Sequence, residues 1–191
     1  MGKANLESLL EERGAILKGH FVLSSGRHSD TYFEKFRILE QPDVLSAVCK
    51  EIADHFRESG AEVVAGPTTG GIIIAFEVAR QLGLPALYVE RTNEKRALRR
   101  GAQVNSGAKV LIVDDVLTTG LSVREVAEMF RAMSAEVVGA GFLVDRSEQT
   151  LDFGFPIFAA IRAEAVTYAP SEVPEWLLQV PVSDPGTRRA T

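Results

Sequence analysis

VLIVDDVLTTGLS, residues 110–122, combines a strand, a polar loop and the start of a helix. Four apolar residues in a row at 110–113, within KVLIV at 109–113, predict a short buried strand. Two adjacent carboxylates follow, Asp114 and Asp115, and then two threonines and a glycine at 118–120. Apolar residues at helical spacing over 123–133 predict a helix directly behind this loop. The stretch therefore predicts a buried strand that ends at a polar site in front of a helix.

The same alternation of strand and helix continues on both sides of this stretch. Helical spacing predicts a further helix at 70–82, and short apolar runs predict strands at 62–66, 86–90, 136–144 and 155–160. The strands are too uniformly apolar to alternate inward and outward residues, which is typical of parallel strands covered on both faces. We therefore expect an α/β fold with a central parallel sheet flanked by helices.

The two ends of the chain differ from this core. Residues 1–40 contain a predicted short helix and strand formers around a Ser-Ser-Gly turn, and 42–59 predict a helix that leads into the sheet. Four prolines from Pro170 onward predict an irregular tail. We expect a single domain over residues 1–191, with a core at about 41–165 and a small hood formed by about 1–40 together with the C-terminal tail.

Composition narrows the class of protein. A chain of 191 residues with 46% hydrophobic side chains suits one globular core, and a net charge of −5 argues against general nucleic-acid binding. The single cysteine, Cys49, fits a reducing compartment, and the three histidines, His20, His28 and His55, are isolated in the sequence without metal-ligand spacing. No secretory signal or bilayer-spanning stretch is visible. We expect a cytoplasmic protein without nucleic-acid or membrane partners.

The polar residues after the strand at 109–113 suggest a ligand. In open parallel sheets, ligands bind beyond the carboxyl ends of the strands, where helices begin. Carboxylates such as Asp114 and Asp115 can accept hydrogen bonds from sugar hydroxyls or influence a bound cation. The turn at 118–120 can present backbone N–H groups to a phosphate, and Ser122 can cap the helix. These residues favour a ribose phosphate; the plainer alternative is that they are helix caps alone.

A second candidate phosphate loop is GPTTGG, residues 66–71, which also lies between a strand and a helix. Its spacing resembles the first part of a P-loop, but Ile72 stands where the phosphate-binding lysine belongs, so ATP or GTP hydrolysis is not expected. By itself the loop is either a tight helix start or an anion site. We expect this loop to face the polar residues at 114–120 across the same edge of the sheet, and that position favours binding of a diphosphate.

The third feature is a basic segment at residues 91–107. It carries Arg91, Lys95, Arg96, Arg99 and Arg100 against one acid, in a chain that is otherwise acidic. Such a run is either a solvated face or a set of cations that closes over phosphates and excludes water. Its position between two strands, at the ligand-binding end of the sheet, makes the second role a candidate.

These motifs resemble those of the orotate phosphoribosyltransferases, a branch of the type I phosphoribosyltransferase family. VLIVDDVLTTG is similar to the family's phosphoribosyl-diphosphate signature. The orotate branch is resembled by FVLSSGRHSDTYFEK at 21–35, GPTTGGI at 66–72, LRRG at 98–101, Asp145-Arg146, and the ending PVSDPGTR at 181–188. The likeness extends over nearly the whole chain in the same order.

The resemblance implies an activity and a set of site residues. Members transfer ribose 5-phosphate from 5-phospho-α-D-ribose 1-diphosphate to N1 of orotate with Mg²⁺, in pyrimidine biosynthesis, and work as homodimers with sites shared between subunits. The resemblance implies that Asp114 and Asp115 hold the ribose hydroxyls, that Arg91 and Lys95 join them in catalysis, and that Thr118 and Arg146 contact orotate. Mg²⁺ would be held mainly by the diphosphate, without direct protein ligands. The residues implied to bind phosphoribosyl diphosphate are Thr69, Gly70, Arg91, Lys95, Asp114, Asp115, Val116, Leu117, Thr118, Thr119, Gly120, Leu121 and Ser122.

Some positions depart from the family pattern. Many members carry lysine where Ser24 and Gly70 stand, and Lys95 meets only half of a usual Lys/His pair, with Ala97 in the histidine's place.

Two alternative functions remain: a related enzyme that acts on a purine or on uracil, and a non-catalytic sensor of phosphoribosyl diphosphate. SGRHSDTYFEK and Arg146 favour orotate, and a sensor should show an added nucleic-acid-binding segment or a basic face, which the sequence lacks.

Overall fold

The computed structural model describes residues 3–23, 25–92, 95–147, 149–162 and 166–184. The chain forms two compact units, one of Met1–Val44 with Ala163–Thr191 and one of Leu45–Arg162. In the part of the chain so described, no helix is both long and apolar enough to cross a membrane. Each unit has its own sheet.

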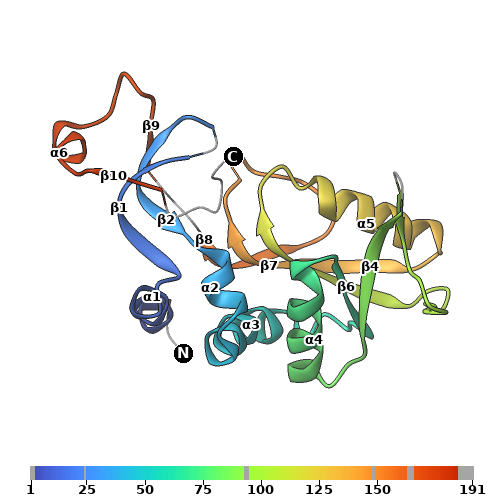
Figure 1. Ribbon diagram of the computed structural model, residues 1–191. Coiled ribbons are helices and arrows are strands. Elements are labelled where there is room, and N and C mark those ends of the chain that lie inside the picture. The colour runs from blue at the N-terminus through green and yellow to red at the C-terminus, as the bar shows by residue number, and fades with distance from the viewer. Residues whose placement is uncertain (1–2, 24, 93–94, 148, 163–165, 185–191) are drawn as a thin grey trace. The chain divides into compact units, whose positions relative to one another are not determined.

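The larger unit is built on a six-stranded sheet (Figure 1). In the order of the sheet, its strands are β5 (Lys95–Ala97), β4 (Ala86–Thr92), β3 (Val63–Pro67), β6 (Lys109–Leu117), β7 (Glu136–Asp145) and β8 (Ile157–Arg162). Neighbours from β4 to β8 pair in parallel, and β5 pairs antiparallel with β4. The predicted α/β fold with a central parallel sheet is confirmed.

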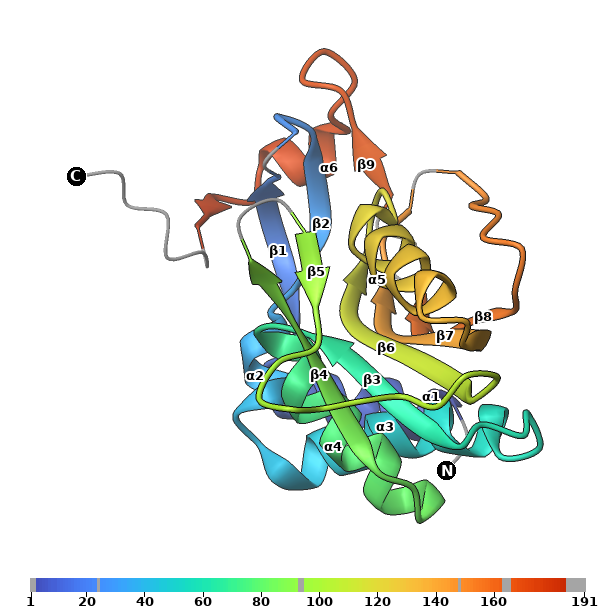
Figure 2. The ribbon, with the colours of Figure 1, turned by 90° about the vertical axis from the view of Figure 1, so that its right-hand side faces the viewer.

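Helices cover both faces of this sheet, as Figures 1 and 2 show together. One face carries α3 (Pro42–Phe56) and α4 (Gly70–Leu82), and the other carries α5 (Leu121–Ala132). Glycines in β7 let α3 approach closely, because a Cβ at Gly139 would come within 2.3 Å of Phe56 Cε1. A glycine inside a strand is typical of such a close contact.

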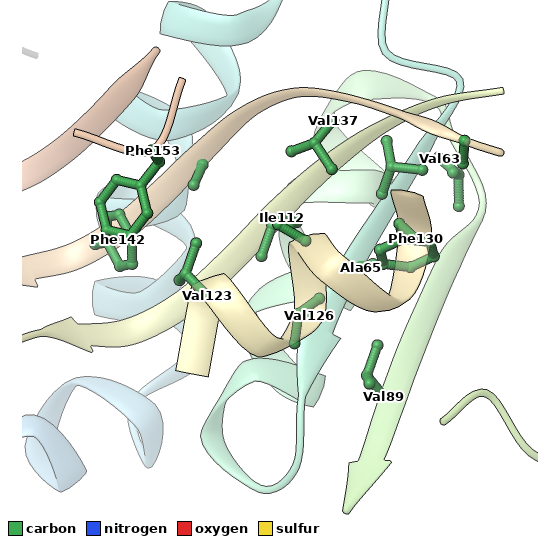
Figure 3. Close-up of a cluster of buried hydrophobic side chains, with 14 of the residues drawn as sticks. Val63, Ala65, Val89, Ile112, Val123, Val126, Phe130, Val137, Phe142 and Phe153 are labelled. Carbon is green, nitrogen blue, oxygen red and sulfur yellow. The ribbon is translucent and has the colours of Figure 1, made fainter. Parts of the chain in front are cut away.

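The face of the sheet under α5 carries a dense apolar core (Figure 3). Val123, Val126 and Phe130 of α5 are at most 1% exposed and belong to one cluster with Ile112 of β6 and Phe142 of β7. Their spacing along the chain forms the apolar stripe of an amphipathic helix. Burial of this stripe holds α5 in place, and with it the loop that precedes the helix.

The boundaries of most predicted elements differ from the observed ones by up to three residues. The strand predicted to end at 113, before the paired acids, is the exception, and this prediction is wrong. β6 continues to Leu117 and pairs with β7 through Asp114–Phe142, Val116–Val144 and Leu117–Asp145. The acids do not end the strand because the two apolar residues that follow them extend the pairing, and Leu117 is 1% exposed.

The smaller unit has a four-stranded sheet in the order β10-β1-β2-β9. Its elements are α1 (Lys3–Glu12), β1 (Ile16–Val22), β2 (His28–Phe33), α2 (Lys35–Leu39), β9 (Thr167–Tyr168), α6 (Glu175–Leu178) and β10 (Val182–Ser183). The pairing of β1 with β2 brings together two histidines that are separate in the sequence, and His20 Nε2 lies 2.6 Å from His28 Nδ1.

The tail is more regular than its prolines predict. It contains α6, whose Leu177 is completely buried, and β10, which pairs in parallel with β1. Pro174 occupies the N-cap of α6, where a missing backbone N–H removes no helical hydrogen bond. The PVSDPGTR ending is described only as far as Asp184; its remainder and Ser24 lie outside the described residues.

Candidate active site

Asp114 and Asp115 lie in the second half of β6, toward the carboxyl end of the parallel strands. Backbone amides of the same strand hold their carboxylates. The Asp115 N–H donates to Asp114 Oδ1 at 2.9 Å, and the Val116 N–H donates to Asp115 Oδ1 at 2.7 Å. These bonds orient both carboxylates and use one oxygen of each.

Burial raises the pKa of Asp114 to about 6. Loss of hydration is the main cause, and the neighbouring charge of Asp115 adds to it. Hydrogen bonds from the Asp115 backbone and the Ser122 side chain, and the positive charge of Arg96, lower this pKa in part. Asp114 is therefore ionised at neutral pH at a cost in stability, which is typical of carboxylates at functional sites.

The turn from β3 to α4 is tight because a glycine stands on each side of it, Gly66 in β3 and Gly71 in the first turn of α4. A Cβ at Gly66 would come within 2.0 Å of the Gly71 carbonyl oxygen, and a Cβ at Gly71 within 2.7 Å of Pro67 Cδ. Thr68 and Thr69, joined by a cis peptide bond, are exposed at the turn. Their hydroxyls and the first amides of α4 form a surface that suits an anion.

The start of α4 meets β6 at Gly70. A Cβ at Gly70 would lie 2.8 Å from Asp115 Oδ2 and 3.3 Å from its Cγ. Glycine at this position therefore lets the Asp115 carboxylate lie against the first residue of α4. The positive end of the helix dipole favours a negative charge there.

The turn at 118–120 connects β6 to α5. Thr118 and Thr119 are exposed, and Gly120 takes the N-cap position with a φ of 74°, a left-handed conformation that favours glycine. Gly120 is also tightly packed, because a Cβ there would come within 2.5 Å of Phe153 Cζ. The turn thus presents two hydroxyls and the N-terminal amides of α5 from a fixed position.

Ser122 is not the helix cap that the sequence predicted. Because Gly120 can adopt the left-handed conformation, α5 begins at Leu121, and Ser122 lies inside its first turn. The Ser122 hydroxyl lowers the pKa of Asp114, as a hydrogen-bond donor to that carboxylate does, and it accepts a hydrogen bond from Arg96 Nη2 at 3.1 Å. Ser122 therefore connects the paired acids to the basic segment.

The start of the basic segment is not a plain loop, because β4 and β5 form an antiparallel hairpin (Figure 2). Arg91 and Arg96 are direct partners across it. Both bind Glu125 of α5: Arg91 Nη2 lies 3.1 Å from Oε1, and Arg96 Nε lies 2.9 Å from Oε2. The Arg96 side chain is 9% exposed, whereas Lys95 is exposed. Residues 93–94, which follow β4 in the sequence, lie outside the described residues.

Thr118 and Arg146, the two residues expected to contact orotate, follow paired strand ends. Leu117 and Asp145 are partners in the sheet, and the Arg146 N–H donates to the Leu117 carbonyl at 2.8 Å. The Arg146 side chain is exposed, while the Asp145 carboxylate accepts hydrogen bonds from the N–H and hydroxyl of Ser147. Residue 148, a candidate partner of Arg146, lies outside the described residues.

Comparison with known proteins places this geometry in a family. Residues 37–158 match the model of the phosphoribosyl transferase domain. The chain is 44% identical to orotate phosphoribosyltransferase from Pelotomaculum thermopropionicum over 99% of its own length and 100% of the relative's. The chain belongs to the orotate phosphoribosyltransferase family. A crystal structure of orotate phosphoribosyltransferase from Aeropyrum pernix superposes with a TM-score of 0.69 at 29% identity, over 83% of this chain and 94% of the other.

Within this orotate phosphoribosyltransferase family member, one unit carries all the candidate residues for phosphoribosyl diphosphate. The structure brings Gly70 to Asp115, and connects Asp114 to the basic hairpin through Ser122. Residues 29–33, part of the SGRHSDTYFEK segment that favours orotate, belong to β2 of the smaller unit, and we predict that their backbone amides help to bind orotate.

Sequence reasoning missed Glu125 and did not separate Arg96 from the other cations. A signal for Glu125 was present, since residues three apart on a helix share one face and Glu125 follows Ser122 by that spacing. No comparable signal marked Arg96, because its burial depends on the pairing of β5 with β4 and on contact with α5.

Proposed function

We propose that this chain transfers the phosphoribosyl group of 5-phospho-α-D-ribose 1-diphosphate to N1 of orotate, which yields orotidine 5′-monophosphate and diphosphate in pyrimidine biosynthesis. This proposal rests on one observation: the pair Asp114–Asp115 lies between the N-termini of α4 and α5. Gly70 of α4 contacts the Asp115 carboxylate, and the turn at 118–120 leads from the acids' strand into α5. Carboxylates suit the ribose hydroxyls, and the two sets of N-terminal amides suit the phosphates. The names of full-length relatives support orotate as the acceptor.

In this proposal Asp114 and Asp115 hold the ribose 2′- and 3′-hydroxyls, and residues 116–122 hold the 5-phosphate. The bond from C1 to the diphosphate oxygen breaks with its electron pair going to diphosphate, N1 of orotate bonds to C1, and the N1 proton is released. Positive charge develops on the ribose ring during this exchange. The protein's contribution is to position the reactants and to neutralise the leaving diphosphate, for which Arg91, Lys95 and the amides after Thr69 are the candidates.

Mg²⁺ is the cofactor that we propose, held mainly by oxygens of the diphosphate. The donor set fits this cation, because Mg²⁺ prefers oxygen ligands and keeps several waters, and the site offers two carboxylates and threonine hydroxyls. Bound there, Mg²⁺ would neutralise charge on the diphosphate. Soluble anionic substrates and a single cysteine suit the cytoplasm as the place of this reaction.

The direct test is the loss of orotate absorbance with purified protein, phosphoribosyl diphosphate and Mg²⁺, run beside uracil, hypoxanthine and adenine. We expect turnover of orotate alone. Turnover of a purine or of uracil at a comparable rate would refute the choice of base. Binding of phosphoribosyl diphosphate without turnover of any base would refute catalysis and favour a sensor.

We further propose a homodimer in which the basic hairpin of one subunit serves the site of the other. Mixing an inactive variant that lacks Arg91 and Lys95 with an inactive variant that lacks Asp114 and Asp115 should then restore activity, because one hybrid site receives only intact parts. Native mass spectrometry should verify that mixed dimers form. Mixed dimers that stay inactive would show that each hairpin serves its own subunit.

A further inference from the structure

The hairpin of β4 and β5 places two like charges opposite each other. Arg91 and Arg96 are direct cross-strand partners, and like charges in that relation destabilise a hairpin. Glu125 of α5 resolves the conflict, because one of its carboxylate oxygens binds each guanidinium, at 3.1 Å and 2.9 Å. A single carboxylate from a different element therefore fastens the hairpin to the first turns of α5.

The contact continues from Arg96 toward the paired acids. Arg96 donates through Nε to Glu125 and through Nη2 to Ser122 Oγ at 3.1 Å, and its side chain is 9% exposed. A guanidinium has donors only, so the Ser122 oxygen must accept this bond. The hydroxyl keeps its one proton to donate, and Ser122 lowers the pKa of Asp114, as a hydroxyl directed at that carboxylate does. The bond from Arg96 therefore occupies the Ser122 oxygen as an acceptor and leaves its proton for the Asp114 carboxylate.

We propose that Glu125 and Arg96 are positioning residues for the transfer reaction, which act through the Ser122 hydroxyl to hold the Asp114 carboxylate in the orientation that accepts the ribose hydroxyl. This inference rests on the proposed function and goes beyond it, since it assigns a role to a helix residue outside the phosphate loop and to a hairpin cation distinct from Arg91 and Lys95. The fork of Arg96 is essential in this role, because it must reach Glu125 and Ser122 at the same time.

The test compares Glu125→Gln, Arg96→Gln, Arg96→Lys and the double variant Glu125→Gln/Arg96→Gln. Glu128→Gln is the matched control, because Glu128 lies on the same helix, carries the same charge and is exposed. Steady-state kinetics are measured for both substrates, and thermal unfolding monitors the fold.

We expect each single variant to lower kcat/KM for phosphoribosyl diphosphate about tenfold or more, as loss of a charge-assisted hydrogen bond does, with little change in the KM for orotate. Arg96→Lys should not rescue activity, since lysine keeps the charge without the fork. The double variant should have a kcat/KM no lower than that of the less active single variant, because residues in one chain of contacts are coupled. The control should stay within about twofold of the wild type.

Three outcomes would overturn the inference: activity of Glu125→Gln equal to that of Glu128→Gln, full activity of Arg96→Lys, or losses that multiply in the double variant. Losses that follow unfolding of the variants would also refute it in favour of a structural role. No turnover of orotate by the wild type or the control would refute the proposed function itself.

Discussion

Replacing Asp114 with asparagine should make the protein more stable and less active at once. Burial and the charge of Asp115 raise the pKa of Asp114 from 3.8 to about 6. The folded protein therefore binds this proton more tightly than the unfolded chain, and its stability falls as the pH rises from about 4 to about 6. Above that window the full cost applies, at about 1.4 kcal/mol for each pH unit of the shift.

Asparagine removes this cost because it does not ionise, and its Oδ1 can still accept the 2.9 Å bond from the Asp115 N–H. We expect Asp114→Asn to gain roughly 2–3 kcal/mol in free energy of unfolding at pH 8, and progressively less as the pH falls toward 4. At the same time kcat/KM should fall by about 10- to 100-fold through loss of a charge-assisted hydrogen bond to the ribose.

Urea unfolding at pH 5 and pH 8 measures the first effect, with Glu128→Gln as an exposed-carboxylate control. Steady-state kinetics measure the second. The reasoning is refuted if Asp114→Asn is less stable than the wild type at pH 8, or if its gain is the same at both pH values. Unchanged kinetics would show that Asp114 is only a structural carboxylate.

Gly70→Ala should lower kcat/KM for phosphoribosyl diphosphate about tenfold with the melting temperature maintained, because the new methyl group displaces the Asp115 carboxylate but suits the helix; normal kinetics would contradict this contact. Arg146→Ala should raise the KM for orotate about tenfold or more and leave that for phosphoribosyl diphosphate nearly constant, since its donors can pair with the anionic base; unaltered orotate kinetics would assign Arg146 to the surface. Phe153 packs beside Gly120, so Phe153→Ala should lower the free energy of unfolding in urea by about 3 kcal/mol and weaken phosphoribosyl-diphosphate binding measured by calorimetry. A loss of stability with normal binding would show that this packing does not hold the turn at 118–120 in its binding conformation.

Several features of this protein follow from local sequence alone. The apolar strands and the stripe of Val123, Val126 and Phe130 predicted the layered α/β fold, because periodicity reports which faces of an element are buried. The order of a strand, paired acids, a small hydroxylated turn and a helix marked the candidate site at 114–122, since residues adjacent in sequence must emerge at the same strand end.

Other features depend on contacts between distant parts of the chain, which local pattern does not report. β6 passes through the paired acids because β7 pairs with it as far as Leu117. Glycine at 70 permits a close contact with Asp115 that the intervening helix and strands create. Only the docking of a hairpin on α5 made Arg96 a buried link between Glu125 and Ser122 rather than one of five cations in a basic run. The sequence supplies these residue types, but only the tertiary fold determines which of their polar atoms come into contact.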